Sequence, residues 1–214
     1  MEYALDMSGM LAIHQALRRD LERLGRLAAR PDGDPARLLR AAVGWEYFKT
    51  FLVAHHTAED QALWPTLREA VAANPDQVAV ADALEEEHSV IEPLLKAIDA
   101  AADPGAADPG AGQQRFGDII DELITKLSSH LAHEETDGFA LIDAALTPAQ
   151  WQHFASVNAD LVRPETPNYV SWLLGEADQQ TRDAFLGKLP PQLVTSYYEQ
   201  WAPAYATRDV WRGM

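Results

Sequence analysis

Four histidines in this chain each fall on the apolar face of a different predicted helix, and two of them are followed one turn later by a glutamate. In chain order the six residues are His14, His55, Glu59, His88, His130 and Glu134. Burying a carboxylate without a partner costs several kcal/mol, so a cation has to accompany this set in a folded core. Imidazole and carboxylate together are ligands of transition metals. The pattern therefore predicts a buried metal site assembled from four helices.

Hydrophobic periodicity defines the four helical segments. In each segment the apolar residues recur at steps of three and four, which places them on one helix face. Breaks are predicted at residues 31–35, at 74–76 and at 103–112, where the repeated Asp-Pro-Gly run is typical of a flexible linker. Thr147-Pro148 is typical of the cap and first turn of a further helix.

We therefore expect an all-α fold in which residues 1–146 form an up-down-up-down four-helix bundle and residues 147–214 form a C-terminal helical extension. A rise of about 1.5 Å per residue places the four histidines at the same depth to within about 6 Å. The extension carries four of the six tryptophans, with helices expected at 148–158, 178–187 and 191–205. It either caps the bundle by burying apolar surface or provides a surface for a homodimer.

Composition excludes several classes of function. A formal net charge of −16 argues against binding to nucleic acid or to anionic membranes. The chain has no apolar run of the roughly eighteen residues that a membrane span needs. It has no cysteine, which excludes disulfides, iron–sulfur clusters and thiolate nucleophiles. The N-terminus lacks the basic region of a signal peptide, so we expect a cytoplasmic protein.

The ligand types narrow the choice of metal. Imidazole with carboxylate suits iron, manganese or zinc, and six ligands fit two octahedral ions bridged by two carboxylates better than one zinc ion. A ferritin-like site needs two Glu-x-x-His pairs, and this chain has only Glu85-x-x-His88. His133-Glu134 opens a zincin-like motif that lacks its second histidine. His56 and His133 lie off the helical stripes and are not counted as ligands.

The order His, His-x-x-x-Glu, His, His-x-x-x-Glu over about residues 7–145 resembles the hemerythrin-like, HHE cation-binding family. The resemblance implies a four-helix bundle with a non-haem centre of two carboxylate-bridged iron ions. It implies that one iron takes His14 and His55, that the other takes His88 and His130, and that Glu59 and Glu134 bridge them.

Two positions depart from the oxygen carriers of that family. One turn after His88, where the carriers have a second histidine, this chain has Glu92, which either fills or leaves open a position on the metal. Both Glu134 and Glu135 follow the last histidine, and Glu134 shares its helix face more closely. We expect a di-iron protein that binds or senses oxygen, peroxide or nitric oxide. The alternatives are an iron-dependent oxidoreductase of weak peroxidase type, and a helical interaction module with a vestigial or single-metal site.

Overall fold

The computed structural model describes residues 3–30, 34–103 and 109–211, with side chains from residue 115 onward in the last range. All the regular structure in these residues is helical, and none of them lies in a strand. The expected all-α class is therefore confirmed. No helix in the described part of the chain combines the length and the apolar character that crossing a bilayer requires.

The helices of the first two thirds of the chain are α1 Ser8–Ala28, α2 Pro35–Ala41, α3 Val43–Ala58, α4 Trp64–Val71, α5 Pro75–Ala102, α6 Pro109–His133 and α7 Phe139–Ala145. Two π-helical turns each join a pair of these helices without a break: η1 Glu59–Leu63 joins α3 to α4, and η2 Glu134–Gly138 joins α6 to α7. The last third contains α8 Pro148–Val162, η3 Arg163–Glu165, α9 Thr166–Leu174, α10 Gln179–Leu186, α11 Pro191–Ser196, η4 Tyr197–Trp201 and α12 Ala202–Ala206.

Side-chain caps start several helices where the sequence predicts a start. The carboxylate of Asp34 accepts a hydrogen bond from the backbone N–H of Arg37, and the Asn74 side chain caps α5 in the same way. Thr147 and Gln150 form a reciprocal capping box at the start of α8. These caps satisfy backbone donors that the first turn of a helix leaves without partners.

The second predicted segment is not one continuous helix. Ala42, between α2 and α3, has an extended backbone with φ −89° and ψ 111°. The cause lies in the C-terminal tail. The backbone N–H of Gly44 donates to the carbonyl of Val210 at 2.7 Å, and a Cβ on Gly44 would lie 2.4 Å from the Trp211 indole. The tail thus docks into this break, and only a glycine allows the indole to approach so closely.

The predicted linker at residues 103–112 is too long at its C-terminal end. Helix α6 already begins at Pro109, so residues 109–112 are helical. A proline is well tolerated in the first turn of a helix, because its missing N–H has no partner there in any case. Residues 104–108 of the predicted linker lie outside the described residues.

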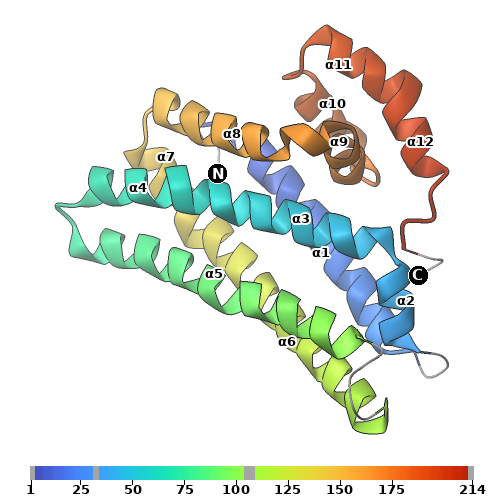
Figure 1. The fold of residues 1–214 in the computed structure, drawn as a ribbon. Helices are drawn as coiled ribbons and strands as arrows, with labels where there is room; N and C mark the ends of the chain where they lie inside the picture. Colours follow the sequence, from blue (N-terminus) through green and yellow to red (C-terminus); the bar gives the residue numbers. More distant parts are fainter. Residues whose placement is uncertain (1–2, 31–33, 104–108, 212–214) are drawn as a thin grey trace.

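In Figure 1 the α3–α4 segment lies between α5 and α8, with α1 and α6 behind it. Helix α6 contacts both α5 and α1, and α8 contacts α3. The buried apolar side chains form two clusters. On α5, Leu84 belongs to one cluster and Ile91 to the other, with His88 between them. The histidines and glutamates thus form a polar layer between two apolar regions.

Helix α9 is one of the elements through which the extension packs on the rest of the chain, along with α8 and α10. The Trp172 side chain is completely buried in the same apolar cluster as residues of α1 and α3. Its ring centroid lies 5.0 Å from that of Phe51, and its Nε1–H donates to Asp20 Oδ2 at 2.7 Å. Burying this aromatic surface is the role expected of a capping extension, and the buried Asp20 fixes how α9 docks against α1.

Candidate metal centre

The six predicted ligands meet in the interior, and each is at most 5% exposed. They fall into two groups, and within each group one ligand atom per residue lies within 4.8 Å of all the others. The first group is His14, His55 and Glu134, and the second is Glu59, His88 and His130 together with His56. Helices α1, α3, α5 and α6 and the turns η1 and η2 supply these side chains. The ligand atoms of each group are therefore close enough together to bind one ion.

The imidazoles face one another through Nε2. The Nε2 atoms of His14 and His55 are 3.4 Å apart, and those of His88 and His130 are 3.2 Å apart. Burial lowers the pKa of His55 well below its ordinary value, so this ring is neutral near pH 7. Two Nε2 atoms this close together could both bind one cation placed between them.

An outer carboxylate orients His14. The Nδ1 of His14 lies 2.8 Å from Glu135 Oε1, and Arg18 donates to the same oxygen at 2.6 Å. Burial raises the pKa of Glu135, but the hydrogen bonds from His14 and Arg18 outweigh it and lower that pKa to about 2. An ionised carboxylate only accepts, so Nδ1 carries the proton. Glu135 is thus an orienting partner of His14, and Glu134 is the carboxylate that faces the group.

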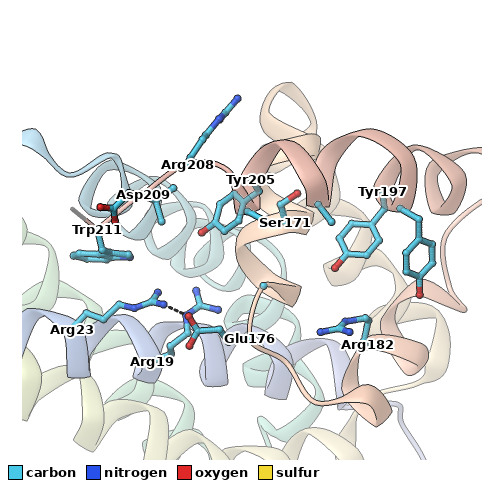
Figure 2. Close-up of a pocket in the computed structure, with 15 residues that line it drawn as sticks. Arg19, Arg23, Ser171, Glu176, Arg182, Tyr197, Tyr205, Arg208, Asp209 and Trp211 are labelled. Atoms are coloured by element: carbon cyan, nitrogen blue, oxygen red, sulfur yellow. Dashed lines mark hydrogen bonds and ion pairs between the residues drawn. The ribbon is translucent and has the colours of Figure 1, made fainter. Parts of the chain in front are cut away.

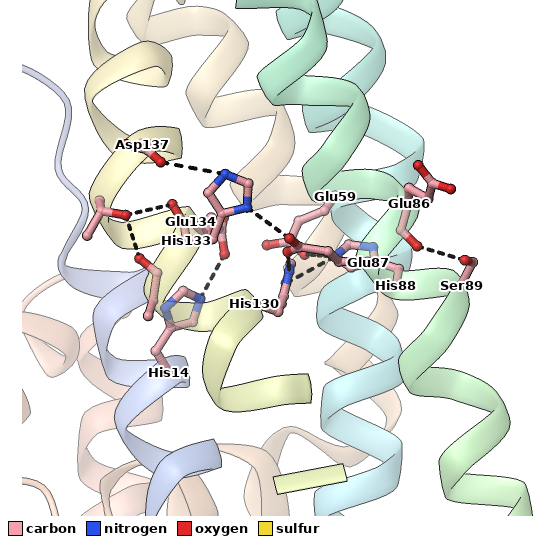
Figure 3. Close-up of polar contacts among 12 residues, drawn as sticks. His14, Glu59, Glu86, Glu87, His88, Ser89, His130, His133, Glu134 and Asp137 are labelled. Atoms are coloured by element: carbon pink, nitrogen blue, oxygen red, sulfur yellow. Dashed lines mark hydrogen bonds and ion pairs between the residues drawn. The ribbon is translucent and has the colours of Figure 1, made fainter. Parts of the chain in front are cut away.

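His88 on α5 and His130 on α6 are each paired with an outer carboxylate in the same way as His14. The Nδ1 of His88 lies 2.8 Å from Asp60 Oδ1. The Nδ1 of His130 lies 2.8 Å from Glu87 Oε2, and the Nδ1 of His133 lies 2.9 Å from Glu87 Oε1, so Glu87 spans the two rings (Figure 3). Pairing of Nδ1–H with a carboxylate is the usual outer partner of a metal-binding histidine, and it leaves Nε2 free to bind the ion.

Glu59 and Glu134 lie where the two groups meet. Glu59 Oε1 is 3.2 Å from His55 Nε2, and Glu59 Oε2 is 3.4 Å from His88 Nε2, so this carboxylate faces both groups. Glu134 Oε2 is 3.1 Å from His14 Nε2. All four carboxylate oxygens are buried and lack a hydrogen-bond partner among the described residues. Buried carboxylates in this state need a cation.

The electrostatics of the site agree with that need. Burial, with the nearby carboxylate of Glu134, raises the pKa of Glu59 well above its ordinary range. Burial also acts to raise the pKa of Glu134, but the close contact with His14 and its charge outweigh burial and lower that pKa. Burial lowers the pKa of His14, but its contacts with Glu134 and Glu135 outweigh burial and raise it, so both shifts favour protons on Glu59 and on His14 where no metal is bound. The donor set fits a metal pair, because divalent ions replace those protons with stronger partners.

His56 is the site residue that the sequence reasoning missed. Its side chain is 2% exposed, both ring nitrogens lack a hydrogen-bond partner among the described residues, and its ring stacks on His88 with centroids 3.8 Å apart. A signal exists in the sequence: Leu52, His56, Glu59 and Leu63 follow one another at steps of four, three and four. Helix α3 is covered on more than one side, so it has a second inward stripe.

Glu92 does not join the second group. Its side chain is 46% exposed and lies 3.7 Å from Lys96 on the same helix. The sequence allowed Glu92 either to fill a position on the metal or to leave that position open. The exposure of Glu92 and its contact with Lys96 argue against the first option. His133 is likewise outside both groups, and its contacts are with Glu87 and Asp137.

Each candidate bridging glutamate is the first residue of a π-helical turn. A π-turn inserts one extra residue into the helix and rotates the following face, and such turns concentrate at functional sites. In the second turn a side chain at position 138 would have little room, since a Cβ on Gly138 would lie 3.1 Å from Leu84 and 3.2 Å from Glu134. Both carboxylates thus stand at the first residue of a π-helical turn, and both are buried.

Comparison with known proteins agrees with this geometry. The sequence profile of the hemerythrin HHE cation binding domain matches residues 7–142, a region that contains both groups and their outer carboxylates. No curated protein and no solved structure matches the chain. The profile match covers more than half of the 214 residues. The chain therefore belongs to the hemerythrin family of HHE cation-binding domains.

Proposed function

We propose that this chain is a hemerythrin-like non-haem di-iron protein that binds or senses oxygen, peroxide or nitric oxide. The observation that carries the proposal is Glu59, whose two oxygens face different histidine groups at 3.2 and 3.4 Å. A carboxylate with one oxygen toward each of two ligand groups has the arrangement of a bridge. Helices α1, α3–α4, α5 and α6–α7 would then be the four members of an up-down-up-down bundle, with residues 147–214 as its extension.

The two groups support an assignment of ligands to each ion. One iron would be held by His14 and His55, and the other by His88 and His130, with Glu59 and Glu134 shared between them. The outer carboxylates support this assignment, because they hold three of the four rings with Nε2 toward the interior.

His56 supplies a fifth imidazole to the proposed centre. It lies with His88 and His130, so one ion would have three imidazoles and the other two. The oxygen carriers obtain the additional imidazole one turn after the third-helix histidine, and here α3 supplies it in place of the surface residue Glu92. A carboxylate ligand would lower the reduction potential of the iron and favour the ferric state. A neutral imidazole adds no negative charge, so His56 would favour the ferric state less than a carboxylate in its place.

When bound, iron would supply redox chemistry toward oxygen, peroxide or nitric oxide. The chain's own contribution is orientation and exclusion of water. Every side chain of the two groups is at most 5% exposed, so only ligands of a few atoms are compatible with the site. The outer carboxylates fix the rings before any ligand enters, which lowers the cost of organising the site.

Metal analysis together with an optical ligand titration tests this proposal. Protein loaded with ferrous iron and then oxidised in air should show ferric charge-transfer bands, and azide should change those bands within mixing time. Turnover of peroxide with a reductant would separate an enzyme from a sensor. Colourless protein that retains zinc, or ferric protein that ignores azide, peroxide and nitric oxide, would instead support a structural role for the cluster.

The role of His56 has its own test. His56→Phe keeps a flat ring stacked on His88 and removes both ring nitrogens, so the charge-transfer bands should move and metal affinity should fall. Glu92→Gln is the matched control, because this surface side chain lies outside both groups and its loss should leave the spectrum unchanged. Equal spectra and equal metal content for His56→Phe and wild type would exclude His56 as a ligand.

A further inference from the structure

A cavity of about 490 Å³ lies between α1 and the helices of the extension (Figure 2). None of the residues in the two histidine groups lines it. Its walls come from α1, from α9 and α10, from η4 and α12, and from the tail that docks at Gly44. The extension thus does more than cover apolar surface, since it forms a partly open cavity with residues of α1.

Positive charge gathers at this cavity. Four arginines and two acidic residues line it, whereas the chain as a whole has a formal net charge of −16. Figure 2 shows Arg19 and Arg23 beside Glu176, with Arg182 further along the same side and Arg208 extending away. Arg19 and Arg23 also pair with the buried Asp20, so the local excess of positive charge is small, but in a chain of net charge −16 it still favours an anion.

Four buried polar atoms around the cavity lack a hydrogen-bond partner among the described residues. They are Arg19 Nη2, Ser171 Oγ, Arg182 Nε and Trp211 Nε1. Ser171 is 2% exposed and Trp211 is 3% exposed. Trp211 Nε1 packs against Gly44, so three of these atoms remain for the cavity itself. A buried donor without a partner costs about 1–3 kcal/mol, so three of them around one space are unusual. Guanidinium and indole N–H groups can only donate and a hydroxyl can do so, so the partner they lack is an acceptor.

The opposite wall is aromatic. Tyr197, Tyr198, Tyr205 and Trp211 all line the cavity, and the rings of Tyr197 and Tyr198 meet edge to face with centroids 5.1 Å apart. Tyr198 is 52% exposed, which is unusual for so large a side chain. Burial raises the pKa of Tyr205 to about 12, so its hydroxyl stays protonated and able to donate. Rings of this kind bind flat apolar groups by stacking and edge contacts.

We propose that this cavity binds a small planar organic anion, an aromatic ring that carries a carboxylate or a phosphate. The oxyanion would accept hydrogen bonds from Arg19, Arg182 and Ser171, and the ring would lie against the tyrosines. The volume lies within the usual range for small-molecule sites, and apolar walls with a few convergent polar groups are their usual composition.

A pair of fluorescent probes tests the proposal. The anion 8-anilinonaphthalene-1-sulfonate should bind the full-length protein saturably, with one molecule per chain. N-phenyl-1-naphthylamine has the same rings without the sulfonate and should bind at least about tenfold more weakly. Benzoate and phenyl phosphate should displace the sulfonate probe, and the stronger competitor identifies the preferred oxyanion. Equal binding of the two probes, or no saturable binding, would overturn the proposal.

Two variants locate the binding. Arg182→Gln should weaken probe binding about tenfold, whereas Arg26→Gln removes an exposed arginine of α1 outside the cavity and should have no effect. Ser171→Ala separates binding from folding. It deletes a hydroxyl that has no partner among the described residues, so stability should stay equal or rise while binding weakens several-fold. Unchanged probe binding in both Arg182→Gln and Ser171→Ala would place the probe elsewhere and refute the site.

Discussion

Replacing Gly44 by alanine should destabilise the protein, although alanine is the better helix former. The new Cβ would lie 2.4 Å from the Trp211 indole, about 1 Å inside ordinary contact distance, so the C-terminal tail must move. Over-packing of this kind costs about 1–3 kcal/mol, and the hydrogen bond from Gly44 N–H to Val210 adds roughly 1 kcal/mol if it breaks. Alanine returns up to about 1 kcal/mol through helix propensity. The net loss should be about 1–3 kcal/mol.

The decisive comparison repeats the substitution in a Trp211→Ala background. Without the indole the clash is gone, so Gly44→Ala should be neutral or stabilising by up to about 1 kcal/mol. Urea unfolding of the four proteins, followed by far-ultraviolet circular dichroism with a chelator present, gives the coupling energy. The reasoning fails if Gly44→Ala destabilises both backgrounds by the same amount, because the cost would then not come from the docked tail.

Three further predictions concern other contacts. Glu87→Gln should weaken metal affinity about 10–100-fold in a chelator competition, since Glu87 orients His130, and unchanged affinity would show that it does not. Burial acts to raise the pKa of Asp6, but the hydrogen bond from Lys188 outweighs burial and lowers that pKa from 3.8 to about 2. The contribution of Asp6 to stability is therefore present above pH 3.8 and lost toward pH 2. Asp6→Asn should therefore cost less than about 1 kcal/mol at neutral pH, given its solvent exposure, and progressively less as the pH falls to 2; a constant cost across this pH range in urea unfolding would contradict the assignment. Trp172→Phe should cost about 1.5–3 kcal/mol through the lost bond to Asp20 without loss of metal, and loss of metal would show that α9 also supports the centre.

Much of the site follows from periodicity, because one turn of helix relates His55 to Glu59 and His130 to Glu134 whatever surrounds them. His56 illustrates the limit of that reasoning. A stripe identifies one buried face, whereas α3 contacts α1, α5, α8 and α9, so a second face is also buried. Which face points toward His88 depends on how the helices are arranged around α3, and the local pattern does not carry that information.

The helix break at Ala42 shows a second limit. The segment after Pro35 has helical periodicity on both sides of Ala42, and Gly44 only weakens the expectation of a continuous helix. The break is explained by Val210 and Trp211, which lie far away in the sequence and dock against Gly44. Such long-range contacts override local propensity. The predicted linker ends too late for a local reason. Pro109 is compatible with the first turn of a helix as well as with a loop, so the sequence pattern does not distinguish the two.

The central claim is that Glu59 and Glu134 bridge two iron ions, and counting the ions tests it most directly. Iron analysis and Mössbauer spectroscopy of fully loaded protein should give two high-spin irons per chain with magnetic coupling between them. Glu59→Ala and Glu134→Ala should each lose at least one iron. A single iron per chain in the fully loaded wild type, or two irons without coupling, would contradict the account.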